Sequence, residues 1–99
     1  NLRDGLQREW LGSVFVNPPY GRKIGDWIKK GYLSTWRQTE FGYVPSGATI
    51  VMLLPARTDT AWFHDYCAKG EIRFLRGRLH FDEHRNAAPF PSMIVIFRG

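Results

Sequence analysis

Residues 49–54, Thr-Ile-Val-Met-Leu-Leu, decide the fold class of this chain. The run is apolar without alternation, which predicts a strand with both faces buried, as in a parallel sheet covered by helices. Pro55 follows at once and ends the strand, because proline cannot donate a hydrogen bond to a neighbouring strand. The sequence therefore predicts a sheet with this strand in its interior.

Strand and helix signals alternate on either side of this segment, which implies a parallel sheet with right-handed crossovers. The last two strands have no helix between them and are expected to form an antiparallel hairpin at one edge. The predicted elements are, in chain order, a strand over 14–16, a helix over 24–33 that extends toward Phe41, turn residues over 42–47, a helix over 60–68 capped by Thr58 or Asp59, a strand over 71–75, an extended piece over 78–81 and a buried strand over 93–97.

The carboxyl ends of the first two predicted strands are expected to meet. Asn17 follows the first strand and residues 55–57 follow the second, and ligands of parallel sheets bind outside such ends. These residues are therefore predicted to share one rim of the sheet.

The composition of the chain indicates which class of partner it binds. Its 99 residues carry 14 Lys and Arg against 9 Asp and Glu, a net charge of +5, and 15% are aromatic. Both features suit nucleic acid, although a Trp-rich core under a solvated basic surface explains them equally well. The single cysteine, Cys67, excludes an internal disulfide and fits a reducing compartment. The longest apolar run, over 50–54, is too short to cross a membrane.

The tetrapeptide Asn17-Pro18-Pro19-Tyr20 carries the clearest chemical signal. A planar exocyclic amine can donate its two hydrogens to the Asn17 side chain and the Pro18 carbonyl while its ring lies on Tyr20. Two such acceptors draw the nitrogen lone pair out of conjugation without a strong base. Gly21 lets a ligand approach the backbone closely. The alternative, a Pro-Pro-Tyr ligand for a WW-type domain, fits poorly between a buried strand and a helix.

Three sequence blocks and this motif resemble a known family. Residues 15–21, Phe-Val-Asn-Pro-Pro-Tyr-Gly, look like motif IV of the amino-methyltransferases. Residues 52–64, 71–81 and 88–97 are similar, in this order, to the phage-type DNA N6-adenine methyltransferases, the Dam-like phage and prophage family. The resemblance covers nearly the whole chain and implies an α/β fold with part of a Rossmann-like class I methyltransferase sheet.

The resemblance also implies partners and residue roles. The methyl donor is expected to be S-adenosylmethionine, the partner double-stranded DNA, and the location the cytoplasm of a bacterial host. Asn17, Pro18, Pro19 and Tyr20 are expected to be catalytic, and Asn17 also to border the cofactor. The expected substrate-binding residues are Tyr20, Gly21, Arg57, Arg78 and Phe90.

Other polar and aromatic residues leave alternatives open. Arg57, Thr58 and Asp59 either contact base and phosphate or serve as a solvated cation and a helix cap. The cations and histidines of the segment before the last strand either bind phosphate or form a charged surface hairpin; they are Arg73, Arg76, Arg78, His80, His84 and Arg85.

The remaining candidates are phenylalanines, histidines and the cysteine. Of the two phenylalanines beside the polar loop, Phe90 is the better pocket candidate and Phe81 the better core residue. The spacing of the histidines, His64 included, predicts no metal site, and Cys67 is expected to pack in its helix.

The sequence also predicts the domain organisation and the activity of the chain. Residues 1–99 are expected to form one domain, the target-base-binding half of a methyltransferase, because no Gly-rich cofactor loop follows a strand before Ser13. The expected activity is methylation of adenine N6 in DNA. The alternatives are an amino-methyltransferase that acts on cytosine N4 or a glutamine amide, and a non-catalytic fragment or DNA-binding module.

Overall fold

The computed structural model describes residues 2–79 and 90–99. Its elements are, in order, α1 (Leu2–Gln7), β1 (Ser13–Val16), α2 (Ile24–Leu33), β2 (Trp36–Thr39), β3 (Gly42–Pro45), β4 (Thr49–Pro55), α3 (Ala61–Asp65), the 3-10 turn η1 (Cys67–Lys69), β5 (Glu71–Phe74) and β6 (Ser92–Arg98). Among these residues no helix is long and apolar enough to cross a membrane. Predicted sites at His80, Phe81, His84 and Arg85 lie outside the described residues.

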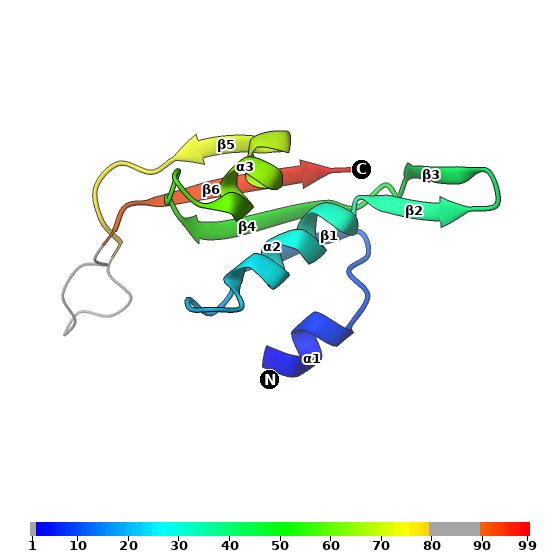
Figure 1. The fold of residues 1–99 in the computed structure, drawn as a ribbon, viewed down its shortest axis with the longest axis horizontal. Coiled ribbons are helices and arrows are strands. Elements are labelled where there is room, and N and C mark those ends of the chain that lie inside the picture. Colours follow the sequence, from blue (N-terminus) through cyan, green and yellow to red (C-terminus); the bar gives the residue numbers. More distant parts are fainter. Residues whose placement is uncertain (1, 80–89) are drawn as a thin grey trace.

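The central sheet has four strands in the order β1-β4-β6-β5 (Figure 1). Only β1 and β4 are parallel neighbours, and β6 runs antiparallel to both β4 and β5. The prediction of a mainly parallel, Rossmann-like sheet is therefore wrong, and the sheet is mixed with mostly antiparallel pairs. The antiparallel pairing of the last two strands at one edge is confirmed, with β5 as the edge strand and β6 between β4 and β5.

The reason for the error lies in the apolar runs. An unbroken apolar strand reports burial on both faces, and a central strand is buried in this way whichever direction its neighbours take. The strand at 93–97 pairs with β4 along its full length and antiparallel to it, from Thr49 opposite Arg98 to Pro55 opposite Ser92, and this pairing makes the sheet mixed.

One face of this sheet is packed against α2. Ile50 and Met52 of β4 and Val95 of β6 are fully buried, and Phe97 is 2% exposed. Gly31 lets the helix approach closely, because an added Cβ would lie 2.7 Å from Met52 Sδ. Leucine-to-alanine changes in such cores cost about 2–5 kcal/mol, so this layer carries much of the stability.

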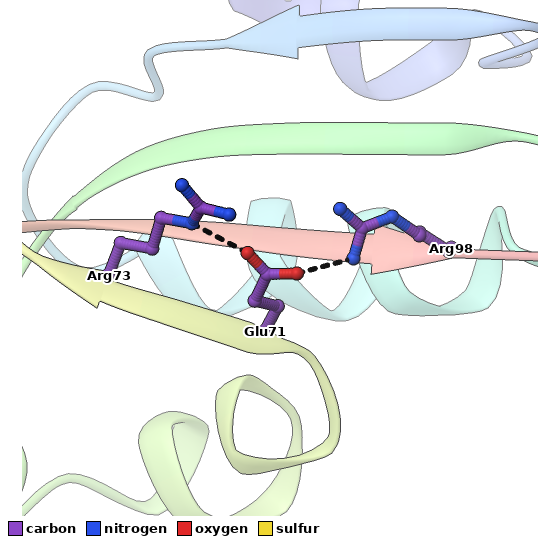
Figure 2. Close-up of polar contacts among 3 residues, drawn as sticks. All are labelled: Glu71, Arg73 and Arg98. Carbon is purple, nitrogen blue, oxygen red and sulfur yellow. Dashed lines mark hydrogen bonds and ion pairs between the residues drawn. The ribbon is translucent and has the colours of Figure 1, made fainter.

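The opposite face carries polar side chains near β5. Glu71 accepts hydrogen bonds from Arg73 Nε at 2.6 Å and from Arg98 Nη1 at 2.7 Å (Figure 2). Both arginines lower the pKa of the Glu71 carboxyl by hydrogen bonding, Arg98 most. The three residues join β5 to β6 at the surface.

A β2–β3 hairpin replaces the predicted continuation of the helix toward Phe41 and the turn over 42–47. The helix ends because Ser34 and Thr35 turn their hydroxyls back onto the carbonyls of Lys30 and Tyr32, each at 2.6 Å. Strands β2 and β3 then pair through a tight turn in which Gly42 has a φ of 111°, favourable for glycine. The hairpin protrudes from one end of the molecule (Figure 1).

The remaining differences are local. The predicted helix over 60–68 is divided into α3 and η1, and Thr60 caps it instead of Thr58 or Asp59, accepting from Phe63 N at 3.3 Å. The extended piece over 78–81 is no strand at its described residues, and α1 was not predicted. The helix at 24–33 is confirmed.

Candidate active site

The parallel pairing of β1 with β4 creates the candidate site. Val16, the last residue of β1, lies opposite Met52, so the segments that follow both strands leave the sheet at the same end. The amino end of β6 and the carboxyl end of β5 are also there, since Ser92 lies opposite Pro55 and Phe74 opposite Met93. We call this end the rim, and its described segments are 17–23, 55–59, 75–79 and 90–92. The predicted common rim is confirmed.

Asn17 and Pro18 leave β1 with different exposure. The Asn17 side chain is exposed, whereas Pro18 is buried and Pro19 half-buried. Within the described part of the chain, no hydrogen bond occupies the Asn17 side chain or the Pro18 carbonyl. Proline fixes its own φ, so the buried Pro18 holds this acceptor pair in a defined backbone. No described residue therefore occupies either acceptor at the rim.

Three of the predicted substrate-binding residues are brought together. The rings of Tyr20 and Phe90 meet edge to face, with centroids 5.0 Å apart and planes at 65°. The Arg57 guanidinium carbon lies 6.0 Å from the centroid of the Phe90 ring, within cation–π range. Two rings and a cation from three distant parts of the sequence thus form one cluster, which consists of Tyr20, Arg57 and Phe90.

The other predicted residues lie close by in the fold. Gly21 has a φ of 135°, a conformation that strains residues with a side chain, so glycine is needed for the turn into α2. Arg78 is exposed in the segment that follows β5, at the same end of the sheet.

The rim is strongly basic. Its described segments contain one acidic residue, Asp59, and the cations Arg22, Lys23, Arg57, Arg76 and Arg78. Sequence reasoning had not selected Arg22 and Lys23, although their place directly after Gly21 was a usable signal. Cations beside the exposed Tyr20 and the half-buried Phe90 suit a flat base carried on a phosphate backbone.

The titratable groups of the site have distinct environments. Burial raises the pKa of the Tyr20 phenol, and the neighbouring Ser92 hydroxyl opposes this to a smaller extent. Tyr20 therefore stays neutral at physiological pH. Cys67, which lies in η1 outside the rim, is fully buried, and this confirms that it packs in the interior. Burial raises the pKa of its thiol to about 12, so the thiol is no thiolate nucleophile.

A cleft of about 530 Å³ opens beside the motif. Pro19, Tyr20 and the turn after them line one side, and Trp27 and α1 line the other. A larger groove of about 740 Å³ lies between α1, α2 and β2, away from the motif. The ammonium group of Lys30, which lines this groove, already donates hydrogen bonds to the carbonyls of Leu6 and Arg8. No group of metal-binding side chains occurs among the residues that the structure describes.

The fold and the rim define a class of protein: a small α/β chain with an acceptor pair for an amino group, flanked by rings and cations. A family model described as DNA N-6-adenine-methyltransferase (Dam) matches residues 2–99. The match covers nearly the whole chain, and the chain belongs to this family of DNA adenine methyltransferases. The sequence matched none of the curated proteins and none of the solved structures with which it was compared.

Proposed function

We propose that these residues transfer a methyl group from S-adenosylmethionine to N6 of adenine in double-stranded DNA. Membership of the family supports methylation of DNA adenine. The observation that carries the proposal is the exposed Asn17 at the end of β1, beside the Tyr20–Phe90 ring pair and Arg57. No other described end of the sheet combines these groups.

The acceptor pair would act on the amine directly. The Asn17 side-chain oxygen and the Pro18 carbonyl each accept a hydrogen bond from the N6 amine, and Pro19 fixes the backbone between them and Tyr20. The nitrogen lone pair is thereby drawn out of conjugation with the purine ring. Since Asn17 is neutral, this stabilisation comes from oriented dipoles and requires no general base. As the bond between N6 and the methyl carbon forms, the sulfur–methyl bond of the donor breaks, and the surplus N6 proton passes to water.

The rings and cations would hold the substrate. Adenine must leave the duplex to reach Asn17, and a flipped base is commonly held by stacking on aromatic rings. Tyr20 supplies that ring and Phe90 closes the other side, while Arg57 and Arg78 contact phosphates. Gly21 gives the sugar-phosphate backbone room beside the turn.

The methyl donor needs groups beyond the described cleft. S-adenosylmethionine, when bound, supplies an electrophilic methyl group, and its ribose hydroxyls usually bind a carboxylate. None of the described residues that line the cleft beside the motif is acidic. The described lining therefore lacks the carboxylate of a cofactor site, and we propose that residues 1–99 are the target-base half of the domain, with Asn17 at its border with the cofactor.

The same observation favours a second candidate function. A DNA-binding module without catalysis would keep the basic rim and the ring pair, and would need no carboxylate in the cleft. Methylation of DNA by the full polypeptide that carries this chain separates the two functions.

The product identifies the reaction. Unmethylated DNA is incubated with the full polypeptide and S-adenosylmethionine, digested to nucleosides and examined by mass spectrometry. We expect N6-methyladenine. If N4-methylcytosine appears instead, the substrate is cytosine and not adenine. If no methylated nucleoside appears, the chain is a DNA-binding module without catalysis.

A further inference from the structure

Arg57 reaches the rim on a short turn whose backbone is held on both sides. Ala56 N donates a hydrogen bond to the carbonyl of Pro91 at 2.8 Å, so the turn lies beside the segment that carries Phe90. The carbonyl of Arg57 accepts hydrogen bonds from the Thr60 hydroxyl at 2.8 Å and from Thr60 N at 3.3 Å. These contacts fix the backbone before and after the arginine.

The guanidinium of Arg57, in contrast, has few contacts of its own. It lies 6.0 Å from the centroid of the Phe90 ring, and among the described residues no ion pair or hydrogen bond holds it. A cation–π contact of an exposed side chain is weak. The direction of this side chain therefore depends mainly on the backbone turn that carries it.

His64 of α3 supplies a further contact to this turn, and the proposed reaction does not use it. Its Nε2 lies 2.8 Å from the carbonyl oxygen of Thr58, the residue after Arg57. A carbonyl oxygen only accepts, so the imidazole nitrogen carries the hydrogen and donates it. The His64 ring also meets the Phe63 ring edge to face, with centroids 5.3 Å apart. His64 therefore links α3 to the backbone next to Arg57.

We propose that His64 is a positioning residue for Arg57. Its hydrogen bond to the Thr58 carbonyl holds the turn, so that the guanidinium stays over the Phe90 ring and meets a phosphate of bound DNA. His64 itself contacts neither the base nor the phosphate. The inference rests on the proposed function, since it concerns the DNA that the rim would bind.

A general structural role for His64 predicts a different pattern. Loss of a side chain that only stabilises α3 would lower the melting temperature and weaken DNA binding whether or not Arg57 is present. A positioning role requires that the effect on binding disappears when Arg57 is absent, because no cation then remains to be positioned.

The test is a double-mutant cycle in the full polypeptide, with DNA affinity measured by fluorescence anisotropy at several salt concentrations. We expect His64→Ala to weaken binding of an unmethylated duplex about 2- to 10-fold, the range of one hydrogen bond. The slope of log K against log salt should move toward that of Arg57→Ala. The double variant should bind no more weakly than Arg57→Ala. Unchanged affinity in His64→Ala, or losses that add in the double variant, would overturn the proposal.

Matched variants separate the hydrogen-bond donor of His64 from its ring. His64→Gln places an amide donor near the position of Nε2 and should bind DNA more tightly than His64→Ala. His64→Phe keeps a ring beside Phe63 without a donor and should bind as weakly as His64→Ala, and wild-type affinity in this variant would contradict the proposal. Thr39→Val removes a comparable hydrogen bond on the β2–β3 hairpin, to the Gly42 carbonyl at 2.9 Å, and should leave the affinity unchanged.

A measurement on the free protein keeps this inference separate from the methylation proposal. Hydrogen exchange, followed by mass spectrometry, is compared for a peptide that covers residues 55–61, where the amides of Arg57 and Thr60 are hydrogen-bonded. We expect faster exchange in His64→Ala and nearly wild-type exchange in His64→Gln. Unchanged exchange in His64→Ala would contradict the support of the turn by His64. A protein that behaves as expected in both experiments but methylates no DNA would contradict the proposed methylation alone.

Discussion

The two ends of the sheet both expose aromatic rings, yet only one has the groups of a reaction site. At the hairpin end, formed by residues 34–48, Phe41 is 92% and Tyr43 69% exposed. The backbone there is tied by hydrogen bonds such as Ser46 N to Thr35 O at 2.8 Å. At the rim, Tyr20 is only 39% exposed and pairs with Phe90 beside Asn17. Exposure of rings therefore does not distinguish the two ends of the sheet, whereas their combination with acceptors that no described residue occupies does.

The largest difference between the ends should come from Asn17. Asn17→Ala removes one acceptor of the amine hydrogens, and loss of one such oriented dipole lowers kcat by about 100- to 1,000-fold. Gln38→Ala, an exposed amide on β2, is the matched control at the hairpin end and should leave kcat unchanged. Steady-state methyl transfer measures both. Equal losses in the two variants would remove the distinction between the ends.

Stacking on Tyr20 should produce the next effect. Loss of one base–aromatic stack costs about 1–3 kcal/mol, so Tyr20→Ala should weaken binding of the target base by about 5- to 150-fold. Tyr43→Ala removes a more exposed ring at the hairpin end and should not change KM. KM for DNA is measured for both variants, with circular dichroism to verify folding. A larger effect of Tyr43→Ala would move the base site to the hairpin.

A smaller effect is expected from the rim cations. Arg57→Ala should weaken DNA binding uniformly across sequences and reduce the slope of log K against log salt by about 1. Arg37→Ala on β2 serves as the control and should preserve the slope. Fluorescence anisotropy with a labelled duplex at several salt concentrations gives both values. An unchanged slope in Arg57→Ala would exclude this phosphate contact.

The ion-paired Glu71 should have the smallest effect, on stability alone. Arg98 and Arg73 lower the pKa of its carboxyl below the ordinary value for glutamate. Its contribution to stability is therefore present above that ordinary value and is lost as the pH falls through the lower pKa of the folded protein. Because these side chains are exposed, Glu71→Gln should lower the melting temperature only slightly at neutral pH and not at all in acid. Melting curves from pH 7 to pH 3 measure this, and a constant difference at all pH values would contradict it.

The sequence predicted the parts of the fold that depend on local patterns. The helix at 24–33, the strand around 49–54 and the shared rim of Asn17 and Arg57 all follow from periodicity and strand ends. The place of β6 could not be predicted, because burial on both faces does not specify the direction of the neighbours. The hairpin was missed because the hydroxyls that end α2, those of Ser34 and Thr35, carry no periodic signal.

The candidate site likewise has one part that the sequence predicts and one part that only the structure shows. The Asn17–Tyr20 motif is contiguous and visible in the sequence, and it predicted where a base would lie. Its contact with Phe90 joins residues distant in sequence and depends on the position of β6 beside β4. His64 gave no signal of its own, since only the structure shows that its ring nitrogen lies within hydrogen-bond distance of the Thr58 carbonyl.

Hydrogen exchange measured by mass spectrometry tests the central distinction between the two ends most directly. The full polypeptide is labelled with and without an unmethylated DNA duplex, and peptides that span residues 17–23 and 36–45 are compared. We predict slower exchange in the rim peptide when DNA is bound and unchanged exchange in the hairpin peptide. Protection of the hairpin peptide with none at the rim would contradict the assignment of the site to Asn17 and its neighbours.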